Sequence, residues 1–178
     1  MKENYANSRF LRISGLLTAV CLAGVIALAA YPTLAAEKGS VECSKDTAQA
    51  VTHSVAVGLG EVLKTVKGEK ERIELIRTFI GPVRFYPDQS GYFYVYNFAC
   101  VNIAHATQKD LVEKNLFDYK DGKGKFVIRE LSAAAKKGGG FVEYFWVKPG
   151  VRGELRKLGY VEPIPGTDYF IGTGVYLP

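Results

Sequence analysis

Aromatic side chains with polar tips recur at alternate positions in two segments of this sequence, and their chemistry suits ligand binding. Tyr144 and Trp146 alternate in the run 141–147, and Tyr94 and Tyr96 alternate in the run 92–97. Alternate residues of a strand share one face. Each pair would therefore present hydroxyl or indole donors on large apolar rings, which suits the wall of a pocket. Packing in an ordinary core is the alternative, and for Tyr144 and Trp146 alone it is the simpler one.

Motifs of common catalytic sites are missing. The sequence has no Gly-x-Ser-x-Gly elbow, P-loop, His-Glu-x-x-His helix or haem-attachment Cys-x-x-Cys-His motif. The segment Gly172-Thr173-Gly174 lies inside an alternating strand with no helix after it, so it is not expected to bind phosphate. His53 lies beside the apolar stripe of a predicted helix, where a surface or partly buried role is expected. We therefore expect neither an enzyme nor a bound cofactor.

The segment Met1–Ala36 has the composition of an export signal. Basic residues precede an uncharged apolar run over 13–31, and small residues follow it. The run is also about as long as a minimal membrane span, so an uncleaved anchor is the alternative. The predicted location is the periplasm or the exterior, or the inner membrane if the segment stays attached. Residues 37–178 carry 20 basic and 17 acidic residues, a net charge of +3 against +5 for the whole chain, which gives no reason to expect nucleic acid binding.

Cys43 and Cys100 are the two cysteines outside that leader. An oxidising compartment would permit a disulfide between them. Their separation in space does not follow from the sequence. A Cys43–Cys100 bridge and two free thiols are therefore both open at this stage.

Hydrophobic periodicity predicts an α+β fold. Apolar residues at helical spacing indicate helices over 42–80, with a break near 67–69, and over 125–137. Gly58 and Gly60 are expected to weaken the first helix. Five strands rich in β-branched and aromatic residues are predicted at 92–97, 101–105, 141–147, 155–161 and 169–176. Short connections favour an antiparallel sheet with the helices mostly on one side.

An ordered set of short segments is more specific than any single motif. The segments are Gly91–Asn97, Ile103–His105, Lys114–Leu116, Asp118, Lys120–Gly124, Ile128–Leu131, Gly139–Tyr144, Trp146, Lys148–Gly150, Lys157-Leu158, Tyr160-Val161 and Ile171–Tyr176. In this order they resemble the single-Cache sensor domain, a family named after calcium channels and chemotaxis receptors. The resemblance is close over 91–176 and loose over the helices before it. It implies a PAS-like five-stranded antiparallel sheet with a long N-terminal helix, in one domain over 37–178 with a helical part at 42–80.

The resemblance also implies a pocket for small metabolites, often short carboxylates, outside the membrane. Polar positions that recur in the family add a histidine, a lysine and a further tyrosine to the aromatic residues above. The predicted ligand-binding residues are Tyr94, Tyr96, His105, Tyr144, Trp146, Lys157 and Tyr160. Aromatic and imidazole groups offer donors on apolar bodies, and Lys157 could add a full charge. The alternatives are a solvated lysine, a satisfied buried histidine and aromatic core residues.

Two departures from the family pattern bear on His105. The family usually has Asp and Gly in the first hairpin turn and Pro after the histidine. Here Asn97-Phe98-Ala99-Cys100 and His105-Ala106 occupy those positions. The shape of the turn and the placing of the imidazole therefore depend on the structure.

Three functions remain open from the sequence. The first is an extracytoplasmic module that binds a carboxylate-like metabolite and serves a membrane receptor or transporter. Because only Leu177 and Pro178 follow the last predicted strand, no output module is expected in this chain. The second is a structural or accessory interaction module of a periplasmic or membrane signalling complex, with a filled core. The third is haem or metal binding through His105, for which the sequence offers no paired ligand.

Overall fold

The computed structural model describes the backbone of residues 23–178 and the side chains from residue 40 onward. The chain divides into two compact units, residues 1–39 and 40–178. The predicted leader Met1–Ala36 lies outside the residues whose side chains are described. Within the described part, no helix combines the length and the apolar composition that crossing a membrane requires. The description below concerns the second unit and the helix that leads into it.

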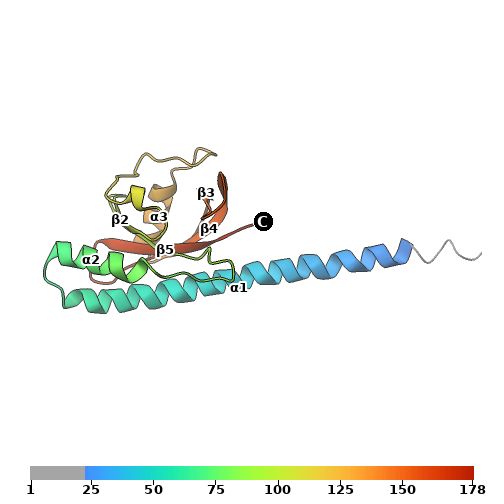
Figure 1. Ribbon diagram of the computed structural model, residues 1–178, viewed down its shortest axis with the longest axis horizontal. Coiled ribbons are helices and arrows are strands. Elements are labelled where there is room, and N and C mark those ends of the chain that lie inside the picture. The colour runs from blue at the N-terminus through green and yellow to red at the C-terminus, as the bar shows by residue number, and fades with distance from the viewer. Residues whose placement is uncertain (1–22) are drawn as a thin grey trace, which may run out of the picture. The chain divides into compact units, whose positions relative to one another are not determined.

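Helices and strands follow the predicted order (Figure 1). They are α1 (Ala23–Lys64), α2 (Glu69–Ile80), β1 (Tyr94–Asn97), β2 (Asn102–His105), the 3-10 turn η1 (Lys109–Leu111), α3 (Val127–Lys136), β3 (Gly140–Val147), β4 (Glu154–Pro163) and β5 (Tyr169–Tyr176). β1 begins two residues later than predicted, because the chain just before it forms an isolated bridge between Phe85 and Gly91.

The five strands form one antiparallel sheet in the order β2-β1-β5-β4-β3. The last strand lies in the centre: Gly172 of β5 is opposite Tyr94 of β1 on one side and Val161 of β4 on the other. β3 and β4 form a hairpin in unbroken register, in which Tyr144 faces Lys157. The predicted α+β class and the PAS-like sheet are confirmed.

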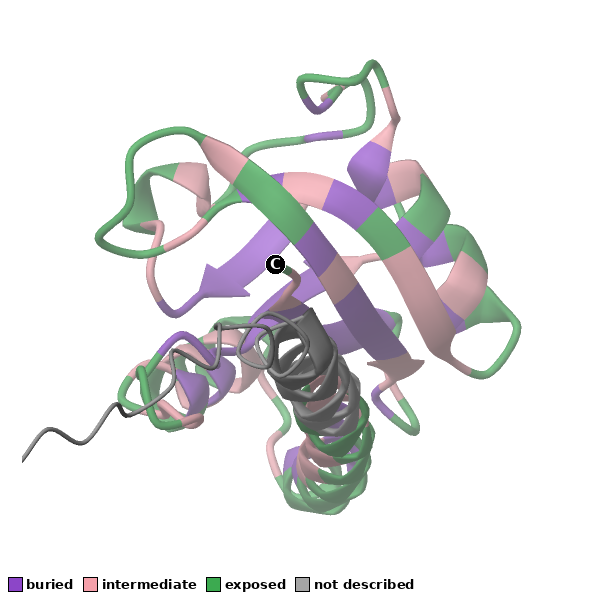
Figure 2. Ribbon diagram, turned by 90° about the vertical axis from the view of Figure 1, so that its right-hand side faces the viewer, coloured by how far each residue is buried: buried purple, intermediate pink, exposed green. Residues whose placement is uncertain are grey.

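Alternation along the strands divides the core between the two faces of the sheet (Figure 2). One face packs against α3 and includes Tyr92, Tyr94, Tyr96, Tyr144, Trp146, Val127, Ile128 and Leu131. The other packs against α1 and α2 and includes Leu59, Leu63, Ile76, Ile80, Phe93, Val95 and Ile171. The helices thus lie mostly on one side, as predicted, with α1 and α2 on that face and only the shorter α3 on the other. Strands with apolar residues on both faces need a cover on both, and each large side chain so buried contributes about 1.5–3 kcal/mol.

The two cysteines are free thiols on different layers, so the suggested disulfide is not formed. Cys100 is buried in the core on the α3 side of the sheet, at the β1–β2 turn. Cys43 is exposed on α1, which packs against the other face. The turn itself is closed by Asn97, whose Oδ1 accepts hydrogen bonds from the amides of Ala99 (3.0 Å) and Val101 (2.9 Å). The positive φ (66°) falls on Cys100 and not on Asn97.

α1 runs through Gly58 and Gly60 without a break. A Cβ at Gly60 would lie 2.9 Å from the carbonyl oxygen of Pro165, so this glycine allows the β4–β5 connection to approach the helix. A Cβ at Gly58 would meet nothing within 4 Å. Only one of the two glycines is therefore required by packing.

The pair gives a matched test of this packing. Gly58→Ala should raise the free energy of unfolding by about 0.5–1 kcal/mol, because alanine is the better helix former and has room. Gly60→Ala should give no such gain and should lower stability, since its methyl group would press on Pro165. Urea denaturation of both variants measures the difference. Equal gains at the two positions would contradict the packing described here.

Candidate functional site

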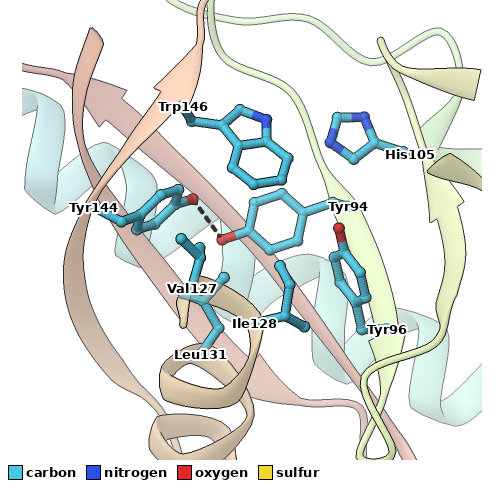
Figure 3. A pocket seen from close by; sticks show the side chains of 8 residues that line it. All are labelled: Tyr94, Tyr96, His105, Val127, Ile128, Leu131, Tyr144 and Trp146. Atoms are coloured by element: carbon cyan, nitrogen blue, oxygen red, sulfur yellow. Dashed lines mark hydrogen bonds between the residues drawn. The ribbon is translucent and has the colours of Figure 1, made fainter. Parts of the chain in front are cut away.

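A small cavity lies between the sheet and α3 (Figure 3). Its lining residues are Tyr94, Tyr96, His105, Val127, Ile128, Leu131, Tyr144 and Trp146. Its volume is about 10 Å³, enough for about one water molecule. Of the seven predicted ligand-binding residues, the structure brings five together here. They are Tyr94, Tyr96, His105, Tyr144 and Trp146.

Most polar tips in the cavity already have partners within the protein. The Tyr94 and Tyr144 hydroxyls are 3.3 Å apart (Figure 3). The Tyr94 hydroxyl also donates to the carbonyl of Thr173 (3.3 Å). The indole N–H of Trp146 donates to Oε1 of Gln108 at 2.7 Å. Burial raises the pKa of Tyr94 and of Tyr144 above the usual value, so both are neutral hydroxyls.

Two glycines of neighbouring strands make room for the rings. A Cβ at Gly172 would lie 2.6 Å from the ring of Tyr94, and one at Gly159 would lie 2.7 Å from the ring of Tyr144. Because glycine presents only a hydrogen there, each ring can lie close over the adjacent strand. The glycines therefore help to set the direction in which the two hydroxyls point.

His105 is a buried, neutral side chain. Its Nδ1 accepts the amide hydrogen of Gln108 at 3.0 Å, which leaves the proton of the neutral ring on Nε2. Burial, with the Lys157 charge as a further cause, lowers the pKa of His105 to about 3. The ring lies nearly parallel to those of Tyr94 and Trp146, with centroids 6.1 and 6.4 Å away. Among the described residues, no three His, Cys, Asp or Glu side chains gather as metal ligands would.

Lys157 is fully buried next to this cavity, although it is not part of the lining. Its Nζ donates to the Tyr92 hydroxyl (3.0 Å), which is 3.3 Å from the Tyr176 hydroxyl. The Nζ also lies 4.1, 4.8 and 5.7 Å from the ring centroids of Tyr92, Tyr176 and Tyr94. Burial lowers the pKa of Lys157, and the Tyr92 hydroxyl opposes that shift. No carboxylate of the described residues forms an ion pair with it, so the solvated-lysine alternative is wrong.

Tyr160 does not join the cavity. It follows Lys157 by three residues in a strand of unbroken register, so its side chain lies on the opposite face. There its hydroxyl donates to Oε1 of Glu162 (2.7 Å), and Oε2 of Glu162 is 3.0 Å from Nδ1 of His53 on α1. Its ring packs on Phe141, with centroids 4.7 Å apart. Burial and the bond to Glu162 raise the pKa of Tyr160 to about 12. The residue therefore links β4 to α1 and has no direct access to a ligand on the other face.

Sequence reasoning did not assign a site role to several neighbours of the cavity. These are Tyr92, Gln108, Val127, Ile128, Leu131 and Tyr176. The alternation Tyr92-x-Tyr94-x-Tyr96 was a signal for the first of them, since all three residues share a face. Ile128 and Leu131 lie in the helix predicted over 125–137, to which no site role was assigned. Gln108 reaches the site from the segment after β2, and Tyr176 reaches it because β5 lies in the centre of the sheet. Neither position has a local signal in the sequence.

Comparison with known proteins identifies a family model that matches this arrangement. The model for the Cache domain (dCache_2) matches residues 44–178, which include every helix and strand of the sheet unit except the start of α1.

Individual relatives agree with that match. The sensor histidine kinase MctS of Rhizobium johnstonii is 40% identical over 89 residues, which are 50% of this chain and 19% of the kinase. The chain therefore matches less than a fifth of that relative. The solved structure of a methyl-accepting chemotaxis protein from Vibrio parahaemolyticus is 29% identical, with a TM-score of 0.69 over 80% of this chain and 95% of that one. A Cache chemosensory domain solved for carboxylic acid recognition is 25% identical, with a TM-score of 0.64 over 79% and 95% of the two chains.

The low pKa of His105 predicts a pH dependence of stability. Below pH 6.5 the imidazole takes up a proton in the unfolded chain, but in the folded protein it does so only near pH 3. The stabilisation that comes from burying a neutral imidazole is thus complete above pH 6.5. As the pH falls toward 3 the free energy of unfolding decreases, by up to about 1.4 kcal/mol per pH unit. Urea denaturation at pH 7, 6, 5 and 4 should show this loss in the wild type and in the exposed-site control His53→Gln. His105→Gln should show a shallower slope, and an unchanged slope would contradict the burial of a neutral imidazole.

Proposed function

This chain belongs to the Cache domain family, and on that premise we propose that it senses a short carboxylate outside the cytoplasm. Cache sensor domains of chemotaxis receptors and histidine kinases are ligand-binding domains and not enzymes. The proposal for this chain adds a ligand class, a charge partner and a location. The proposal also treats residues 37–178 as one Cache domain.

The observation that carries the proposal is the buried ammonium of Lys157. A cation removed from water needs an opposite charge or several hydrogen bonds. The described residues give it one hydroxyl, that of Tyr92, and three ring faces. A ligand carboxylate would supply the missing charge, and a charge-assisted hydrogen bond contributes about 1.5–3 kcal/mol net.

The lining of the cavity supports a ligand with a small apolar part. Rings and the aliphatic side chains of Val127, Ile128 and Leu131 make up most of the wall, as is usual in small-molecule sites. The cavity of about 10 Å³ is too small for a carboxylate, so binding requires α3 to move outward. Glycines flank this helix on both sides, with φ of +85° at Gly124 and +99° at Gly138, where the backbone can change direction without steric cost.

Location and partners follow from the relatives. The matched kinase and chemotaxis protein are signalling proteins by name. We infer that this chain acts in the periplasm or the exterior, or at the inner membrane if its N-terminal segment serves as an anchor. A membrane receptor or transporter would be its protein partner.

An accessory interaction module is the second candidate, and a surface feature favours it. A hollow of about 650 Å³ lies between α1 and α2, with largely apolar walls. Val62 and Phe79 on its border are 47% and 48% exposed. If this surface carried the function, no small carboxylate would stabilise the protein.

Thermal and chemical denaturation with acetate, propanoate and butanoate test the proposal. A carboxylate at 100 times its Kd should stabilise the wild type by about 2.7 kcal/mol. Lys157→Met should abolish that gain but keep the fold, because a buried unpaired cation is replaced by an apolar chain of similar length. Lys64→Met is the control, since Lys64 pairs with Glu61 (2.6 Å) on α1, which packs against the other face of the sheet. Full stabilisation of Lys157→Met by a carboxylate would refute the assignment.

A further inference from the structure

Polar atoms without partners occur in Tyr96, which lines the cavity, and in Asn102, which lies beside Tyr96 in the sheet but is not part of the lining. The Tyr96 hydroxyl and both amide atoms of Asn102 are buried and make no hydrogen bond with any described residue. The two residues are 1% and 0% exposed. They are opposite each other in the β1–β2 register, next to an irregularity between Val95 and Tyr96. Buried polar groups are rarely left in this state, so the pair is prepared for a group from outside the chain.

The Tyr96 hydroxyl differs in this respect from the other polar tips of the lining. The hydroxyls of Tyr94 and Tyr144 bond to each other, and the Trp146 indole bonds to Gln108. Tyr96 lines the cavity together with them. Among these four aromatic side chains, it is the one whose tip is left for a ligand.

Tyr96 and Lys157 lie at opposite ends of one row of rings. Tyr92, Tyr94 and Tyr96 follow each other on the same face. The Lys157 Nζ is 4.1 Å from the Tyr92 ring and 5.7 Å from the Tyr94 ring. The centroids of the Tyr94 and Tyr96 rings are 5.9 Å apart. A ligand whose carboxylate meets Lys157 would therefore reach Tyr96 only with its other end.

The Tyr96 end carries no charge. Burial is the main cause of the raised pKa of Tyr96, the nearby Asn102 side chain opposes the shift, and the neighbours that add to it are other tyrosines, with no lysine, arginine or carboxylate among them. A second carboxylate there would lose its hydration without gaining a cation. A neutral hydroxyl or carbonyl oxygen would lose far less hydration energy than a carboxylate. It could form hydrogen bonds with the Tyr96 hydroxyl and with the Asn102 amide, and each of these groups can both donate and accept.

We propose that Tyr96 and Asn102 form a second polar subsite, which takes a neutral oxygen at the end of the ligand remote from its carboxylate. This inference rests on the proposed carboxylate site and names its ligand class. That class is monocarboxylates with a distal hydroxyl or oxo group. Plain alkanoates, 2-hydroxy acids and dicarboxylates fit the two subsites less well.

Calorimetric titration of the protein with four acids tests the subsite. The probes are butanoate, 2-hydroxybutanoate, 4-hydroxybutanoate and succinate. In the wild type, 4-hydroxybutanoate should bind about threefold to tenfold more tightly than butanoate, the value of one additional hydrogen bond. 2-Hydroxybutanoate and succinate should bind no more tightly than butanoate.

Tyr96→Phe removes only the unpartnered oxygen. It should bind butanoate as the wild type does and should lose the preference for 4-hydroxybutanoate. Tyr169→Phe is the matched control, because the Tyr169 hydroxyl is also buried without a partner among the described residues but belongs to the core on the other face. This control should keep the preference.

The possible failures are distinguishable. If butanoate binds and depends on Lys157, but 4-hydroxybutanoate gains nothing or keeps its gain in Tyr96→Phe, the subsite is refuted and the proposed function stands. Tightest binding of succinate or 2-hydroxybutanoate also refutes the subsite. If none of the four acids binds, the proposed function fails and the subsite with it.

Discussion

The complete burial of the Lys157 amino group is the constraint on which the rest of this region depends. An ammonium without contact to water is expensive to bury, and here a tyrosine hydroxyl and the faces of three rings compensate for only part of the cost. On the proposed function, an anion would supply the missing charge. That proposal would give a reason for a lysine, and not an apolar residue, in the middle of an aromatic core.

β4 connects that charge to the other layer of the protein. Its side chains alternate, so Lys157 lies beside the cavity while Tyr160 and Glu162 contribute to the contact with His53 on α1. β4 therefore contacts the layer that holds the cavity with one face and α1 with the other.

α3 is the wall that determines how much space the site has. Its aliphatic side chains line the cavity of about 10 Å³, and glycines with positive φ lie on both sides of the helix. The polar groups differ along the sheet, with Lys157 beside the cavity and the uncharged Tyr96 in its lining. Size and polarity are therefore set by different elements, the first by a helix and the second by the sheet.

The sequence by itself determined the fold class, the five strands and the two pairs Tyr94 with Tyr96 and Tyr144 with Trp146, because a period of two places alternate residues on one face. That the two pairs meet in one cavity depends on how the sheet and α3 pack. The same rule argues against a shared site for Lys157 and Tyr160, because residues three apart in a strand lie on opposite faces. Their joint assignment to the ligand site came from the positions that recur in the family. Tertiary structure alone decided that Cys43 and Cys100 stay apart, that α3 covers the second face and that Lys157 has no carboxylate partner among the described residues. Those outcomes depend on the strand order β2-β1-β5-β4-β3, which brings together residues far apart in the chain and leaves no trace in local residue patterns.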